Sequence, residues 1–204
     1  MSNDLQATEK SKIFAEAINY SSYRALVKSL LLENKTTGNN HSEAMIAYTK
    51  MNDHRMDRWD KKITLDDVLI EKVRTLPKMK WLVITEAWCG DAAQNIPIIA
   101  KIAEENANID LRFIMRDEHP EIMDLYLTNG ARSIPILVLM DENFHDLTTW
   151  GPRPKQVQEM VIEAKDTPDL DQTKFIEKVH KWYAVDKNKT ISLEFLDILN
   201  KIKQ

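Results

Sequence analysis

Residues 81–92 read WLVITEAWCGDA and contain the clearest structural signal in the chain. The first five residues form a short apolar run, which is typical of a strand buried in a parallel sheet. Cys89 follows this run, and the apolar residues of the next segment, 91–106, recur at helical spacing. The pattern predicts a strand, a cysteine at the strand-to-helix junction, and a helix.

The following residues extend this unit into a small α/β sheet. A second apolar run lies at 109–115, and a right-handed crossover predicts that it is parallel to the first strand. Two further strands are predicted at 134–140 and 144–150, and the turn at 141–143 makes them antiparallel. We therefore expect a mixed sheet of about four strands. Shorter helices are predicted at 118–128 and 156–165.

Helical patterns flank this sheet on both sides. On the N-terminal side, helices are predicted at 11–33, with a bend near 20–23, at 42–60, and from residue 64. On the C-terminal side, they are predicted at 172–185 and 192–202. We therefore divide the chain into an N-terminal helical extension (1–79), a core (80–165) and C-terminal helices packed on the core (166–204). The N-terminal helices are expected to cover an edge of the sheet.

The composition indicates a soluble globular protein. The chain has 204 residues, 43% of them apolar, which is sufficient for a hydrophobic core. With 28 basic and 32 acidic residues, the sequence carries no basic block that would bind nucleic acid or an anionic membrane. The first twenty residues lack the features of a signal peptide, and no apolar run approaches the ~20 residues of a membrane span. We therefore expect a cytoplasmic location.

Cys89 is the only cysteine, which excludes an intramolecular disulfide and a cysteine zinc cluster. At a helix start, the free amides and the helix dipole favour the thiolate, the form that attacks disulfides. A buried, inert thiol is an equally open reading of this position. The five histidines have no metal-ligand spacing, and the sequence has no glycine-rich phosphate loop, so we expect neither a metal nor a bound cofactor.

Residues 88–92, WCGDA, resemble the active-site turn of the thioredoxin superfamily, whose members usually carry Trp-Cys-x-x-Cys. Pro97 resembles the proline that kinks the active-site helix, residues 133–135 (Ser-Ile-Pro) resemble the cis-proline loop, and Gly151 resembles the glycine after the last strand. The resemblance covers about 80–163. Within it, the Trp-Cys-Gly-Asp variant of the motif is similar to a subgroup of bacterial thioredoxin-like proteins. It implies a thioredoxin-like fold, catalysis at Cys89, and substrate docking at Ser133, Ile134 and Pro135, with a cis bond before Pro135.

The sequence also departs from the family pattern. Ala92 stands in place of the resolving cysteine, which excludes a standard dithiol cycle. Val83 and Phe113 replace the buried aspartate and its lysine partner. Glu86 and Asp91 flank the thiol and are candidate acid/base groups, although a helix-capping role for Asp91 is favoured. Their negative charge would raise the thiol pKa and so oppose the helix dipole.

Three functions follow from these observations. The leading hypothesis is monothiol chemistry: Cys89 attacks a disulfide of a protein or a low-molecular-weight thiol, and an external thiol such as glutathione, bacillithiol or coenzyme A releases the mixed disulfide. Trp88, Gly90 and Asp91 would shape the turn. The alternative is a catalytically inactive binding or scaffold module. A glutathione-transferase-like enzyme ranks third, because the C-terminal helices span too few residues for a helical domain.

Overall fold

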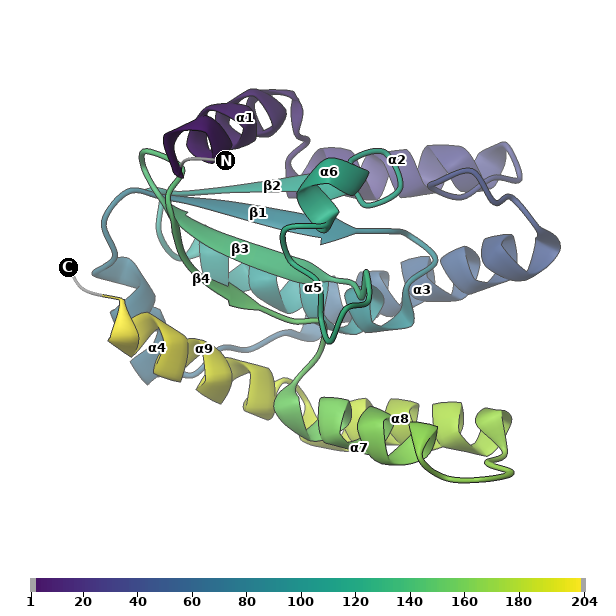
Figure 1. Cartoon of the computed structure of the whole chain (residues 1–204). Helices are drawn as coiled ribbons and strands as arrows, with labels where there is room; N and C mark the ends of the chain where they lie inside the picture. Colours follow the sequence, from purple (N-terminus) through teal and green to yellow (C-terminus); the bar gives the residue numbers. More distant parts are fainter. Residues whose placement is uncertain (1–2, 203–204) are drawn as a thin grey trace.

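The computed structural model describes residues 3–202, which form a four-stranded mixed sheet with helices around it (Figure 1). The strands are β1 (Met79–Thr85), β2 (Ile109–Met115), β3 (Ile136–Asp141) and β4 (Asp146–Trp150). Their order in the sheet is β2-β1-β3-β4. β1 and β2 are parallel, whereas β3 pairs antiparallel with both β1 and β4. The predicted thioredoxin-like mixed sheet is therefore confirmed.

The helices surround the sheet on both faces and along one edge. Figure 1 shows α5 behind the sheet, α6 in front of it, and α1 and α2 near β2. The bounds are α1 (Asn3–Glu16), α2 (Tyr20–Leu32), α3 (Glu43–Lys62), α4 (Asp67–Arg74), α5 (Gly90–Glu104), α6 (Pro120–Met123), α7 (Lys155–Lys165), α8 (Gln172–Asp186) and α9 (Lys189–Lys201). None of these helices combines the length and apolar character that crossing a bilayer requires.

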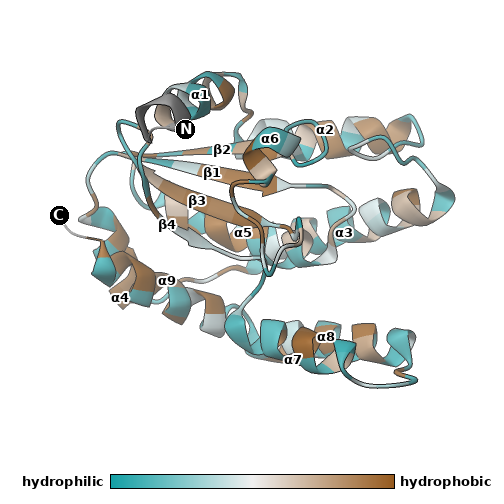
Figure 2. Ribbon diagram, viewed as in Figure 1, coloured by the Kyte–Doolittle hydropathy of each residue, from teal (hydrophilic) through white to brown (hydrophobic). Residues whose placement is uncertain are grey.

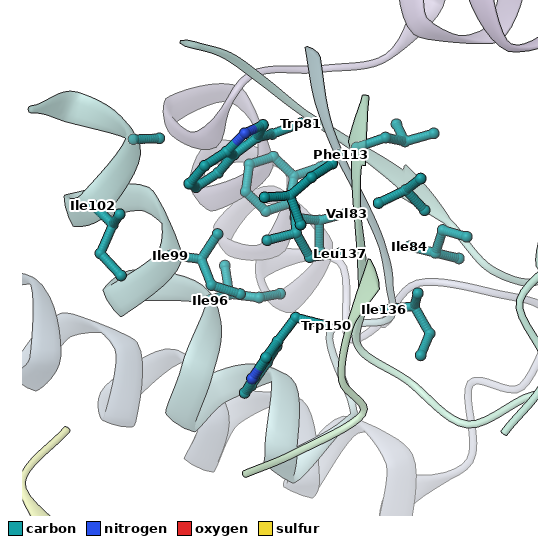
Figure 3. Close-up of a cluster of buried hydrophobic side chains, with 14 of the residues drawn as sticks. Trp81, Val83, Ile84, Ile96, Ile99, Ile102, Phe113, Ile136, Leu137 and Trp150 are labelled. Carbon is teal, nitrogen blue, oxygen red and sulfur yellow. The ribbon is translucent and has the colours of Figure 1, made fainter. Parts of the chain in front are cut away.

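The core lies between the sheet and α5. All residues of β1 except Lys80 are buried, as expected for a strand with neighbours on both sides and on both faces. Figure 2 shows that hydrophobic residues predominate in the central strands β1 and β3. Figure 3 shows apolar side chains of the sheet, such as Trp81 and Leu137, facing Ile96 and Ile99 of α5. This packing holds the start of α5 rigidly at the carboxyl end of β1.

The predicted helix 11–33 is two helices rather than one bent helix. α1 ends at Glu16, and Ile18 then exchanges two backbone hydrogen bonds with Phe113 of β2, at N···O distances of 2.8 and 3.2 Å. The Asn19 side chain accepts a hydrogen bond from the Ser22 amide and caps α2. The helix is interrupted because Ile18 satisfies backbone groups at the edge of the sheet.

The predicted helix 118–128 is also shorter than expected. α6 occupies only Pro120–Met123, and the chain then enters a tight turn in which Thr128 and Ala131 pair across Asn129 and Gly130. Both residues inside the turn have positive φ, which a helix does not permit. The turn brings the chain back to β3.

Candidate functional site

Cys89 occupies the N-cap position of α5, between β1 and the helix. Its Sγ accepts a hydrogen bond from the Ala92 amide at 3.5 Å, and its thiol donates to the Ile134 carbonyl oxygen at 3.3 Å. The residue is only 9% exposed. The sulfur therefore serves the role that a serine or aspartate side chain usually serves at a helix start.

The environment of this thiol favours its protonated form. Burial raises the pKa of the Cys89 thiol to about 12, and the negative charge of Asp91 adds to the increase. The amides of Ala92 and Asp91 and the charge of Arg153 act in the opposite direction, but they do not overcome burial. Burial is thus the largest influence on this thiol, and it acts against the thiolate.

The loop opposite the thiol contains a cis peptide bond between Ile134 and Pro135. Ser133 and Ile134 precede it, and the Ile134 side chain is buried. Gly151 packs against this loop with φ at +127°, and a Cβ atom there would lie 2.3 Å from the Pro135 carbonyl oxygen. Only glycine fits this position. The turn at Cys89 thus contacts the cis-proline loop through Ile134, and Gly151 contacts the same loop at Pro135.

Asp91 lies beside the thiol but is committed to other partners. Its Oδ2 accepts a hydrogen bond from Arg153 Nε at 2.8 Å and forms an ion pair with Arg153 Nη2, also at 2.8 Å. Its Oδ1 accepts a hydrogen bond from the Tyr183 hydroxyl at 2.9 Å, and the Asn95 amide donates to that hydroxyl oxygen at 3.1 Å. Asp91 thus links α5 to the segment after β4 and to α8, and the expected helix-capping role falls to Cys89 instead.

Glu86 is fully buried and faces a neighbouring loop. Its Oε1 accepts a hydrogen bond from the Asp117 amide at 2.9 Å, and its backbone carbonyl accepts one from the Cys89 amide at 3.1 Å. Burial raises the pKa of the Glu86 carboxyl. Its Oε2 has no hydrogen-bond partner within residues 3–202. Glu86 therefore ties the turn to the residues after β2.

Aromatic packing fills the space in which thioredoxins hold their buried aspartate and lysine. Val83 and Phe113 are cross-strand partners, and both are almost completely buried. The Tyr23 ring of α2 stacks on Phe113 with ring centroids 5.3 Å apart and an angle of 9° between the planes. Tyr23 is itself 1% exposed. A residue of the N-terminal extension thus completes the apolar floor beneath the turn.

The remaining turn residues have distinct surroundings. Trp88 is half-buried beneath the Arg116 guanidinium, which lies 4.8 Å from the centre of one of its rings. Ala92 is 1% exposed, so the position of the missing second cysteine is packed. A Cβ atom on Gly90 would lie 3.9 Å from Arg55 Nη1 and 4.0 Å from His180 Cε1. Gly90 thus faces α3 and α8, away from the partners of Cys89.

Sequence reasoning identified the turn and its opposing loop but missed Tyr23, Arg153 and Tyr183. These residues lie more than sixty positions from Cys89 and Asp91 in sequence, and no local pattern marks them. The described part of the chain contains no group of three histidine, cysteine, aspartate or glutamate side chains arranged to hold a metal ion.

Comparisons with known proteins agree with this geometry. A crystal structure of a protein of unknown function from Pseudomonas aeruginosa, PA1234, is 19% identical, with a TM-score of 0.56 over 76% of this chain and 89% of that chain. An HIV 4E10 epitope-scaffold is 17% identical, with a TM-score of 0.60 over 95% of this chain and 98% of that chain. Both similarities concern the fold alone.

No curated protein matches the chain. A family model described as thioredoxin matches residues 38–165, which is more than half of the chain. This match spans α3, α4, the whole sheet and α7, and it includes Cys89 and the loop at Pro135. The chain therefore belongs to this thioredoxin family.

Proposed function

We propose that this protein is a thioredoxin-family binding module in which Cys89 stabilises the active-site turn and does not turn over as a nucleophile. One observation carries the proposal: the sole thiol of the chain is buried, caps α5, and has a pKa raised to about 12. No second cysteine is present to release a mixed disulfide.

The raised pKa has a large kinetic consequence. At pH 7 a pKa of about 12 leaves roughly one thiol in 10⁵ ionised, against about 3% for a free cysteine with a pKa of ~8.5. Because the thiolate is the attacking species, disulfide exchange at Cys89 would be slow even before burial restricts access.

The added helices support the same proposal. Tyr23 of α2 underlies the turn, the Asn52 side chain of α3 donates to the Ala87 carbonyl oxygen at 2.9 Å, and Tyr183 of α8 holds Asp91. Each contact fixes one part of the turn in place. A turn held from three sides is suited to presenting a constant surface to a partner and poorly suited to the opening that an exchange reaction needs.

Monothiol chemistry is the second candidate, favoured by the cis bond at Pro135 and by the Ile134 carbonyl facing the thiol. In this reaction the Cys89 thiolate attacks a disulfide, forming one new S–S bond and expelling one thiolate. An external low-molecular-weight thiolate then attacks the mixed disulfide and regenerates Cys89, so that the external thiol supplies the electrons.

Intact-mass spectrometry after incubation with oxidised glutathione distinguishes the two candidates. The binding-module proposal expects no adduct on the native protein and a full adduct after unfolding in urea, which shows that the thiol itself is competent. A Cys89→Ser variant controls for labelling elsewhere. Rapid formation of one adduct on the folded protein would contradict the proposal and support monothiol chemistry.

Restoring a second thiol provides an independent test. In a folded Ala92→Cys variant, the proposal expects little insulin-disulfide reductase activity, because Asp91 and burial still suppress the Cys89 thiolate. Clear reductase activity in this variant would show that the site retains its catalytic capacity.

A further inference from the structure

Two adjoining cavities lie between α3 and the C-terminal helices, on the side of α5 that Gly90 faces. The smaller, of about 650 Å³, lies between α3, α5 and α8, and the larger, of about 880 Å³, lies between α3, α4, α8 and α9. Both are lined by Arg58 and Ala184, so they meet there. We call the two cavities together the α3–α8 furrow.

The furrow concentrates positive charge that has no carboxylate partner. On α3, Lys50, His54, Arg58 and Lys62 follow one another at intervals of four residues and line one side of it. Lys187 and Lys189 line the other side of the larger cavity. Within residues 3–202, none of these lysine and arginine side chains forms an ion pair.

Arg55 of α3 also lines the smaller cavity and, unlike the cations named above, is half-buried. Among the described residues, its guanidinium forms hydrogen bonds with no carboxylate; its partners are the Asn52 side-chain oxygen at 3.0 Å, the Met51 sulfur at 3.2 Å and His180 Nε2 at 3.0 Å. Burial and the charge of Arg58 lower the pKa of Arg55. A guanidinium partly removed from water without a counter-charge is unfavourable, and an anion at this position would relieve the cost.

His180 is the neighbour of Arg55 at the smaller cavity. Its Nδ1 is buried and has no hydrogen-bond partner among the described residues, while its Nε2 contacts Arg55. Burial and the neighbouring Arg55 lower the pKa of His180. A buried ring nitrogen without a partner is uncommon in a native structure.

The larger cavity has a different character. Its inner lining includes Trp59, Leu65 and Leu69, which are buried, together with Leu196. Asp66 is the one carboxylate among the described lining residues, and it is occupied in capping α4 through the Val68 amide. The furrow therefore joins a strongly cationic end to an apolar one, and each cavity falls within the size range of small-molecule sites.

We propose that the α3–α8 furrow binds a phosphorylated small molecule, with the phosphate at Arg55, Lys50 and Arg58 and an apolar or aromatic body against Leu65 and Leu196 of the larger cavity. Several unpaired cations suit a phosphate better than a single carboxylate, because a phosphate carries more charge and accepts bidentate hydrogen bonds from guanidinium groups. The site is separate from the thiol of Cys89.

Isothermal titration calorimetry of the full chain at low salt tests this proposal with three probes. Adenosine 5′-diphosphate combines phosphates with an aromatic body, pyrophosphate lacks the body, and adenosine lacks the phosphates. We expect the diphosphate nucleotide to bind most tightly, pyrophosphate more weakly, and adenosine not measurably. Equal affinity for the nucleotide and pyrophosphate would overturn the assignment of a body to the larger cavity.

Matched variants locate the site. Arg55→Gln should weaken nucleotide binding at least tenfold, because it removes the bidentate donor. Lys50→Gln alters an exposed side chain, should leave folding undisturbed, and should weaken nucleotide binding about threefold. Arg74→Gln, at an exposed side chain outside the furrow, and Cys89→Ser should both bind as the wild type does. The Cys89→Ser result separates this proposal from the one made for the thiol.

Three results would overturn the proposal. The first is the absence of binding for both phosphate-bearing probes at millimolar concentration. The second is undiminished binding in the folded Arg55→Gln and Lys50→Gln variants. The third is binding of an oligo-glutamate peptide without binding of the nucleotide, which would assign the furrow to an acidic protein segment.

Discussion

The start of α5 separates two regions whose charged groups differ in how they are satisfied. On the thiol side, Asp91 is held by Arg153 and Tyr183, and Cys89 bonds to the Ile134 carbonyl oxygen and the Ala92 amide. On the furrow side, Arg55 is half-buried and has no carboxylate partner within residues 3–202. The family resemblance draws attention to the first region, whereas the unmet electrostatic requirement lies in the second.

The same contrast occurs on the two sides of α3. Arg24 of α2 forms ion pairs with Asp53, Asp57 and Asp60 on one side of the helix. The basic residues that line the furrow, including Arg58, have no carboxylate partner within residues 3–202. One helix thus uses its acidic side for internal structure and leaves its basic side available to a ligand.

The largest expected effect concerns the support beneath the thiol. Tyr23→Ala should lower the free energy of unfolding by about 3–5 kcal/mol, because it removes a buried ring stacked on Phe113. The matched change Tyr48→Ala, at a residue 43% exposed on α3, should cost about 0.5 kcal/mol or less. Urea unfolding measures both. Equal, small costs would show that α2 is not an integral part of the core.

The ion pair of Arg153 comes next. Arg153→Gln leaves Asp91 largely buried without a cation and should cost roughly 2–3 kcal/mol, somewhat below the value for fully buried pairs. The double variant Arg153→Gln/Asp91→Asn should recover part of this loss, because no uncompensated charge remains. A double variant that is no more stable than Arg153→Gln would contradict the assigned role of Asp91.

Glu86→Gln should have a smaller effect on stability, and of the opposite sign: it should stabilise the protein. Because the folded-state pKa of Glu86 is raised, its stabilising contribution is complete below the unfolded-state pKa of about 4.5 and is lost as pH rises through the folded-state value. At neutral pH the neutral isostere should raise the melting temperature by roughly 2–4 °C, or about 1 kcal/mol. Thermal unfolding at pH 7 and pH 4 measures this, and a gain that persists undiminished at pH 4 would rule out the explanation.

The smallest expected effect is on the furrow side. Arg58→Gln should change stability by no more than about 0.5 kcal/mol, because this exposed cation has no carboxylate partner among the residues that the structure describes and repels Arg55. It is the same substitution as at Arg153, so the comparison isolates the surroundings of each arginine. A cost as large as that of Arg153→Gln would mean that Arg58 is structurally satisfied after all.

Much of the fold could be predicted from the sequence. The apolar runs at 81–85 and 109–115 both correspond to strands, and the cysteine lies at the predicted strand-to-helix junction. These features are local, because strand and helix periodicity is visible within a few residues. The bounds of α1, α2 and α6 were less accurate, because they depend on pairing between Ile18 and β2 and on a turn at 128–131.

The candidate site was harder to predict. The turn and the loop at Pro135 were visible as motifs, but the ionisation of Cys89 depends on burial and on the distant charge of Arg153. The furrow was also missed, although its four-residue spacing on α3 is present in the sequence. Basic residues at that spacing usually form a solvated helix face, and only the packing of α8 across α3 turns them into part of a cavity.

The pH dependence of Cys89 alkylation by iodoacetamide in the native protein tests the central claim most directly. At pH 7.5 we expect a rate about three orders of magnitude below that of a free cysteine, still rising through pH 10 without a plateau, with full reactivity restored in urea. A plateau with a midpoint below about 8.5, at a rate close to that of a free thiol, would contradict the account and establish Cys89 as a reactive thiolate.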